Sequence, residues 1–233
     1  MKTLQKKLLK SNGNGSQGLD IAQVERITIA PPNFQVAEFR IVGTAPYVQN
    51  KFSKKAQDQI RATQEAGSTA RSGKKREAKD FQACYESAKH KTKEGWCGIP
   101  APAFRNAMVD ACKTAGFHMT KARLAVFVLP DGFDAEDGTP LVKITKGAPK
   151  YHQSWVRNET GVVDLRARAM WDEGWEARVR VRFDADMFTK TDVAALLMRA
   201  GQQVGVGEGR PGGKTCGMGW GLFDLAKPEK NKD

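Results

Sequence analysis

The sequence predicts an α+β protein with a ferredoxin-like (RRM-like) β-α-β-β-α-β core. Three observations support this: segments of alternating apolar and polar residues that indicate strands, two segments of helical period, and the order in which they follow one another. Without a basic insertion, that order is strand, helix, strand, strand pair, helix, strand. We expect one extra β-hairpin, a basic insertion after the first core strand and a C-terminal glycine-rich loop.

Composition predicts a polyanionic partner. The 233 residues carry a net charge of +12, and an excess of this size is more typical of nucleic-acid binding than of binding to an anionic membrane. The sequence has neither a run of 18 apolar residues nor an apolar signal segment, so we expect a cytoplasmic protein with no membrane partner. The four cysteines form no CxxC pair, which is typical of reduced thiols.

Changes in composition along the chain predict its domain organisation. We expect a flexible basic N-terminal arm at 1–18, a single ferredoxin-like domain at 19–226 and a flexible C-terminal tail at 227–233. Within the domain, 51–95 is a basic insertion, in which the stretch Lys51–Lys93 holds twelve Lys/Arg against five Asp/Glu. We expect it to be helical at its ends and to lie outside the core. It is either a solvated linker or a basic arm that binds a polyanion, through residues such as Lys51, Lys54 and Lys55.

The first half of the core is predicted from its periodicity. Val36–Val42 alternates apolar and charged residues, as a half-buried strand does. A helix follows that begins near Pro102 and ends before Gly116, because its apolar residues recur at helical spacing between these two boundary residues. Arg123–Leu129 and Leu141–Thr145 are predicted strands, joined by an acidic turn that we interpret as a solvated loop.

In the second half, Val163–Met170 and Glu176–Phe183 predict a β-hairpin, because both segments alternate and a turn sequence containing Gly174 joins them. The alternation places five arginines on one face. A stripe of like charges without an interleaved carboxylate predicts an external anion, although the arginines of an exposed face can also serve solubility alone. The five arginines are Arg166, Arg168, Arg178, Arg180 and Arg182.

The second helix is predicted from its cap. Thr189 and Asp192 have the spacing of a capping box, and Gly201 ends the helix. The glycine-rich stretch Gly201–Gly221 follows, with glycine at nine of its 21 positions. Clustered glycines let backbone N–H groups approach a partner closely, most often a phosphate, although many such segments are mobile loops. The proposed phosphate cradle comprises Gly205, Gly207, Gly209, Arg210, Lys214, Gly217 and Gly219.

Two nucleotide-binding motifs do not fit this stretch. A P-loop requires a glycine five residues before Gly213-Lys214-Thr215, where this chain has Glu208. A dinucleotide fingerprint follows a strand and opens a helix, whereas Gly207-x-Gly209-x-x-Gly212 follows a helix. We therefore expect no nucleotide cofactor.

Two motifs resemble those of the RAMP superfamily of CRISPR-associated proteins. Ile99-Pro100 followed by Phe104-Arg105-Asn106-Ala107-Met108 is similar to the motif that opens the first helix of many members, and Gly205–Gly221 resembles their glycine-rich loop. The resemblance is strongest to the backbone-type effector subunits, and it extends to proteins of temperate-phage early regions. It implies a RAMP domain that holds single-stranded nucleic acid by its backbone, with Arg105 as a further contact. It also implies assembly along the strand, with Lys51–Lys93 or Met170–Trp175 as a clamp.

We therefore expect a non-catalytic protein that assembles along RNA or single-stranded DNA into a filament or multi-subunit complex, without metal or cofactor. The alternatives are a phage single-stranded-DNA-binding or recombination protein, a metal-independent endoribonuclease of the same superfamily, and a structural virion component. The endoribonuclease would need a histidine as general acid or base. None of His90, His118 and His152 has a paired Lys or Tyr at a recognisable spacing, so we expect binding without turnover.

Overall fold

The computed structural model describes residues 30–52, 54–65, 80–157, 163–213 and 217–227. Pro32–Asp233 forms one compact unit, which is described here by itself. The predicted N-terminal arm, Lys214 and nearly all of the predicted C-terminal tail lie outside the described residues. Among the described helices, none is both long and apolar enough to span a membrane.

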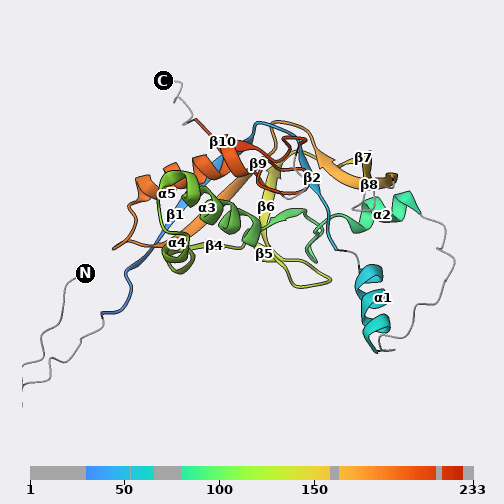
Figure 1. Ribbon diagram of the computed structural model, residues 1–233, viewed down its shortest axis with the longest axis horizontal. Helices are drawn as coiled ribbons and strands as arrows, with labels where there is room; N and C mark the ends of the chain where they lie inside the picture. Colours follow the sequence, from blue (N-terminus) through green and yellow to red (C-terminus); the bar gives the residue numbers. More distant parts are fainter. Residues whose placement is uncertain (1–29, 53, 66–79, 158–162, 214–216, 228–233) are drawn as a thin grey trace, which may run out of the picture. The chain divides into compact units, whose positions relative to one another are not determined.

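The core is a four-stranded antiparallel sheet with two helices, in the order β-α-β-β-α-β (Figure 1). The strands lie in the order β10-β1-β9-β4, and every neighbouring pair is antiparallel. The predicted α+β ferredoxin-like fold is thereby confirmed. Its elements are β1 (Phe34–Gly43), α3 (Ala101–Ala115), β4 (Val126–Leu129), β9 (Glu176–Asp184), α5 (Lys190–Arg199) and β10 (Phe223–Leu225).

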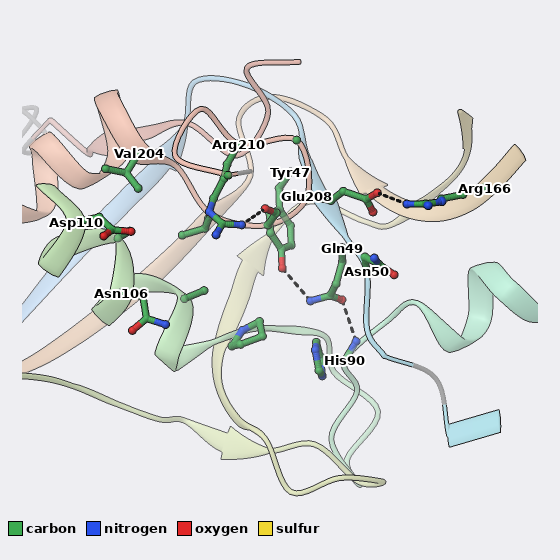
Figure 2. A pocket seen from close by; sticks show the side chains of 17 residues that line it. Tyr47, Gln49, Asn50, His90, Asn106, Asp110, Arg166, Val204, Glu208 and Arg210 are labelled. Carbon is green, nitrogen blue, oxygen red and sulfur yellow. Dashed lines mark hydrogen bonds and ion pairs between the residues drawn. The ribbon is translucent and has the colours of Figure 1, made fainter. Parts of the chain in front are cut away.

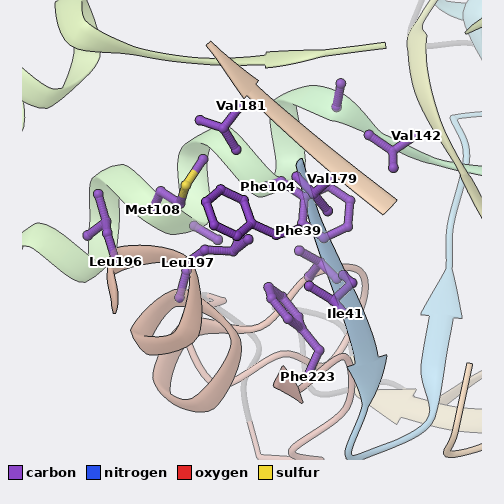
Figure 3. Packing of buried hydrophobic residues seen from close by; sticks show 14 of the residues in the cluster. Phe39, Ile41, Phe104, Met108, Val142, Val179, Val181, Leu196, Leu197 and Phe223 are labelled. Atoms are coloured by element: carbon purple, nitrogen blue, oxygen red, sulfur yellow. The ribbon is translucent and has the colours of Figure 1, made fainter. Parts of the chain in front are cut away.

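Alternation along β1 and β9 determines which face of this sheet is buried. Phe39 and Val179 face the helices and are buried, whereas their neighbours Arg40 and Arg178 are exposed on the other face. Figure 3 shows the buried side packed against α3 and α5, where Phe104 meets Phe223 edge to face at 5.6 Å between ring centroids. On the face of the sheet opposite the helices, the charged side chains of β1 and β9 are exposed or half-buried.

Three of the four predicted helix boundaries are confirmed, but the predicted end of the second helix at Gly201 is wrong, because Gly201 lies inside a π-helical turn that continues it. Gly116 ends α3 in the left-handed region at φ 70°, and its N–H donates to the Cys112 carbonyl. Thr189 and Asp192 form the complete capping box of α5. The helix then continues as a π-helical turn, η1 (Ala200–Val204), and Gly205 follows at φ 72°.

Three further strands extend this sheet. β6 (Pro140–Lys146) pairs with β9, and both β3 (Gly98–Pro100) and β5 (Gly132–Phe133) pair with β6. The prediction of a strand beginning at Arg123 is wrong in its first residues, because a short helix, α4 (Met119–Ala125), occupies them. The strand itself starts at Val126.

A separate three-stranded sheet lies beside the core, in the order β2-β8-β7. Its strands are β2 (Tyr47–Gln49), β7 (Lys150–Arg157) and β8 (Val163–Trp171). The extra hairpin is therefore β7–β8, and the predicted pairing of Val163–Met170 with Glu176–Phe183 is wrong. The connection between β8 and β9 packs against the end of β1 instead: Trp175 is buried, and Gly174 N–H donates to the Gly43 carbonyl.

The basic insertion is helical at both ends, as predicted: α1 (Lys54–Glu65) and α2 (Phe81–Ser87). Residues 66–79 between them lie outside the described residues. The expectation that the insertion lies outside the core is wrong at its margins. Lys51, Lys89, His90 and Thr92 are all at most 8% exposed.

Candidate functional site

The glycine-rich loop directs several of its N–H groups at protein carbonyls. Glu208 N–H donates to Val48 O at 2.9 Å, and Gly221 N–H donates to Pro46 O at 2.7 Å. Val206 N–H closes the loop on itself by donating to Gly221 O. The glycines predict a close backbone approach, and this part of the loop makes it to β2, to Pro46 just before β2 and to the loop's own backbone.

Individual glycines are needed for different reasons. A Cβ at Gly207, where φ is +84°, would lie 2.5 Å from the Val48 carbonyl oxygen. A Cβ at Gly209 would lie 2.6 Å from the Trp220 ring. Gly217 and Gly219 also have positive φ, yet no described atom lies within 4 Å of a Cβ built there. Packing thus accounts for Gly207 and Gly209, whereas Gly217 and Gly219 are constrained by their backbone conformation and not by a neighbouring described atom.

A cleft of about 530 Å³ lies between this loop, α3 and the segment that follows β2 (Figure 2). Polar side chains come from segments far apart in sequence: β2 with the residue that follows it, the segment after α2, α3, β8 and the glycine-rich loop. Ala103, Ala107, Val204 and Val206 supply part of its apolar lining. The polar side chains are Tyr47, Gln49, Asn50, His90, Asn106, Asp110, Arg166, Glu208 and Arg210.

Buried hydrogen bonds hold one wall of the cleft rigid. Gln49 Nε2 donates to Tyr47 Oη at 2.9 Å and to Gly98 O at 2.8 Å, while Gln49 Oε1 accepts from His90 N–H. Burial raises the pKa of Tyr47 far above its ordinary value, so its hydroxyl stays neutral. The wall therefore presents neutral donors and acceptors rather than a charge.

Two arginines and two carboxylates face this cleft. Arg210 crosses the glycine-rich loop, and its Nη1 donates to Gly207 O at 2.9 Å. Glu208 pairs with Arg168 and lies 3.9 Å from Arg166 Nη1. Asp110 lines the cleft from α3. The positive charge of Arg166 is therefore partly balanced by Glu208 and by Asp164, which lies 3.6 Å from Arg166 Nε, whereas Arg210 donates to a backbone carbonyl.

The predicted stripe of arginines without carboxylates is wrong on two counts. Arg166 and Arg168 belong to the β2-β8-β7 sheet, whereas the other three arginines belong to β9. Carboxylates are also interleaved: Glu38 lies 3.8 Å from Arg178, and Asp131 lies 3.0 Å from Arg180. The sequence hides these partners because they come from β1 and from the loop after β4.

The other predicted binding residues are dispersed. Lys51 is buried, with Nζ 2.7 Å from Asp134 and 2.8 Å from Glu136, so it stabilises the fold and is not exposed to a ligand. Lys54 and Lys55 begin α1, and only their backbone is described. Arg105 and Arg182 meet away from the cleft, around the Phe127 ring.

A histidine–carboxylate pair beside the cleft was not predicted. His90 Nδ1 lies 2.8 Å from Asp134 Oδ2, and the Asp134 side chain is fully buried. Asp134 belongs to the acidic turn that was interpreted as solvated; that interpretation is wrong for this residue. No local spacing could have revealed the pair, because 44 residues separate its members.

His90, Asp134 and Asp137 place ligand atoms within 4.8 Å of one another, a spacing compatible with a metal ion. Both Asp134 oxygens are already engaged, however: Oδ1 by the Lys51 ammonium and Oδ2 by His90. Lys51 therefore supplies the positive charge that a metal would bring, and we assign no metal to this cluster.

Comparisons with known proteins leave the resemblance to the RAMP superfamily a prediction. No protein-family profile matches the sequence, and no curated protein matches it. Among solved structures, the fold is similar to a chain in the "Cryo-EM structure of the Type III-B Cmr-beta bound to cognate target RNA", with a TM-score of 0.47 and 9% sequence identity. The match covers 84% of this chain and 60% of that one. A likeness this distant carries no functional argument.

Proposed function

We propose that the protein binds single-stranded nucleic acid, RNA or DNA, in the cleft between the glycine-rich loop and α3, and that it assembles along the strand without cleaving it. The observation that carries this proposal is the convergence of Asn106, Arg166 and Arg210 on one cleft from three separate segments. Arginine and asparagine side chains are typical ligands of phosphate and sugar oxygens. The net charge of +12 supplies the long-range attraction.

The dimensions of the cleft favour a single strand over a duplex. Its volume of about 530 Å³ lies in the range of pockets that enclose one small ligand. A strand with unpaired bases can insert a nucleotide into such a cleft, whereas a paired base is held in the duplex stack.

The β7–β8 hairpin is the candidate clamp for assembly. Trp155 is 65% exposed on β7, opposite Leu165 of β8, which is 44% exposed. In the predicted clamp at Met170–Trp175, Trp171 and Trp175 are fully buried and the exposed side chains are those of Asp172 and Glu173, so this segment presents no aromatic side chain to a bound base. An exposed tryptophan on a hairpin is suited to stacking on a base of a bound strand.

Binding titrations with matched single-stranded RNA, single-stranded DNA and duplex at several salt concentrations test the proposal. We expect single strands to bind more tightly, with a log–log salt slope of about −0.7 per phosphate neutralised. Arg166→Ala should weaken binding and reduce the magnitude of the slope by about 0.7, since it removes one cleft cation. Arg199→Ala, which removes an exposed cation of α5, is the matched control. A flat salt response contradicts the proposal, and duplex binding at least as tight favours the virion alternative.

A second candidate function, metal-independent RNA cleavage, is favoured by one observation. His90 lines the cleft, and Asp134 holds its Nδ1, which leaves Nε2 as the ring nitrogen available for proton transfer. Labelled single-stranded RNA incubated with a chelator tests it: His90→Gln should abolish cleavage that His118→Gln, in an exposed position, leaves intact. Intact RNA after incubation with the wild-type protein rules out this candidate.

A further inference from the structure

The outer face of the ferredoxin-like sheet carries an aromatic pair at one end. Phe34 of β1 and Phe127 of β4 meet edge to face, with ring centroids 5.9 Å apart, although 93 positions separate them in the sequence. β9 runs between their strands. Phe34 is 38% exposed, so part of its ring is open to solvent.

Two arginines contact these rings. Arg182 Cζ lies 4.7 Å from the centroid of Phe34 and 5.0 Å from that of Phe127. Arg105 Cζ lies 5.1 Å from the Phe127 centroid, and its guanidinium donates to the carbonyls of Val126 and Arg123. Both guanidinium groups are thus held against aromatic rings rather than against acids.

The arginines in the middle of β9 are paired with carboxylates, whereas the arginines at this end of the sheet have no such partner among the described residues. Arg178 and Arg180 pair with Glu38 and Asp131. By contrast, neither Arg182 nor Arg105 has a carboxylate partner in the described part of the chain. Arg123, whose carbonyl accepts from Arg105, is exposed on α4 and adds a further positive charge, as does the exposed Lys121 of the same helix. This end of the face is therefore complementary to an anion that also carries a flat ring.

We infer that Phe34, Phe127, Arg182 and Arg105 form a second binding site, at which one base of a single-stranded nucleic acid stacks and its neighbouring phosphate pairs with Arg182. The inference rests on the proposed function. Bases stack on aromatic rings and on guanidinium planes, and arginine binds phosphate through two parallel hydrogen bonds. We call this group the sheet platform.

The sheet platform and the cleft share helix α3. Asn106 lines the cleft, and the adjacent residue, Arg105, reaches Phe127. A bound strand can therefore contact both sites by passing around this helix. The cleft then holds the backbone and one inserted nucleotide, and the platform stacks on a further unpaired base.

An oligonucleotide that lacks bases separates the contribution of base stacking from that of phosphate pairing. We would measure binding of the full-length protein to a fluorescent single-stranded oligonucleotide and to an abasic oligonucleotide of equal length. Phe34→Ala should weaken binding to the normal strand about five- to 150-fold, the range measured for one stacked base, and leave binding to the abasic strand unchanged. Arg182→Gln should weaken both and reduce the magnitude of the salt slope by about 0.7.

Matched controls lie on the same face. Val36, which is 57% exposed and lies opposite Arg182 in the β1–β9 register, and Arg178, which is paired with Glu38 further along β9, are on the same face as the platform residues. Val36→Ala and Arg178→Gln should leave both affinities within about twofold of wild type. Phe34→Leu preserves apolar bulk and so keeps the strand folded, yet it should show the same base-dependent loss as Phe34→Ala. Circular dichroism of each variant verifies the fold.

The outcomes distinguish this inference from the proposed function. If the wild-type protein binds neither oligonucleotide, the proposed function fails. If it binds both and the folded Phe34 variants bind as wild type, only the sheet platform is overturned. Loss of self-association in the Phe34 variants, with unchanged affinity for the normal strand, would identify this face as a protein interface and also overturn the inference.

Discussion

Lys51 lies in the most basic part of the sequence, yet its ammonium is buried between two acids. Its side chain is 3% exposed, and that of its partner Asp134 is fully buried. Burial by itself lowers the pKa of Lys51, but hydrogen bonds to Asp134 and Glu136 outweigh it and raise that pKa above its ordinary value. Lys51 therefore stays charged and is a structural cation.

Replacing Lys51 should destabilise the protein strongly. Lys51→Met leaves Asp134 buried without its counter-ion, so we expect the free energy of unfolding in urea to fall by about 3 to 5 kcal/mol. Glu136→Gln is the control: Glu136 contacts the same ammonium but is 57% exposed, and its loss should cost less than about 1 kcal/mol. If both substitutions lower the free energy of unfolding by the same small amount, Lys51 is not a structural cation.

The same cluster predicts how stability depends on pH. Burial alone raises the pKa of Asp134, but hydrogen bonds from Lys51, the Glu136 N–H and His90 lower it below its ordinary value. Because the folded-state pKa is below the unfolded value of about 3.9, the stabilisation is complete above about pH 4 and is lost as the pH falls through the folded-state pKa.

Urea denaturation between pH 7 and pH 3 measures this effect. The stability difference between wild type and Asp134→Asn should be large at neutral pH and narrow below about pH 4. Asp58→Asn changes an exposed residue of α1, so its free energy of unfolding should differ from that of wild type by the same amount at every pH. A difference that stays constant down to pH 3 would show that Asp134 does not titrate as proposed.

At the scale of elements, the glycine-rich loop consists of an anchored part and an open part. Gly219→Ala places a Cβ in open space and costs only the left-handed backbone conformation, about 1 to 2 kcal/mol. Gly207→Ala adds a contact of 2.5 Å with the Val48 oxygen, so its free energy of unfolding should fall further. Chemical denaturation of the two variants measures the difference, and equal losses would contradict the assignment of Gly207 as an anchor.

This division changes how binding defects in the loop are interpreted. A bulky residue at Gly207 displaces the loop from β2, so a loss of binding there does not identify a phosphate contact. Gly219→Ala removes no packing and is the informative variant. If it remains folded and binds as wild type, the open part of the loop is a connector, and the cleft arginines provide the binding.

On the scale of the whole molecule, the proposal predicts assembly. On long single strands we expect complexes whose mass, measured by native mass spectrometry, grows in steps of one subunit per fixed number of nucleotides. If the β7–β8 hairpin is the clamp, Trp155→Ala should abolish this stepwise series of complexes. Phe133→Ala removes an exposed aromatic side chain of β5 and should leave the series unchanged. One monomer bound to each long strand would contradict assembly.

Much of the core could be predicted because its signals are local. Alternation placed Val36–Val42 and Glu176–Phe183 in strands, and boundary residues such as Gly116 and Thr189 defined the helix ends. The order of these segments then predicted the ferredoxin-like core. Each of these features depends on residues within a few positions of one another, so sequence alone was sufficient.

Strand pairing and ion pairing could not be predicted from local patterns. Alternation shows which face of β8 is buried but not which strand lies beside it, so the pairing with β7 and β2 could not be read from periodicity. Lys51 and Asp134 are 83 positions apart, and Glu38 approaches Arg178 only because β1 and β9 are neighbours. Local sequence patterns were enough to predict the six core elements, their order and the basic character of the chain. The fold decided which cations remain free for a ligand, because ion pairing depends on distances that only packing sets.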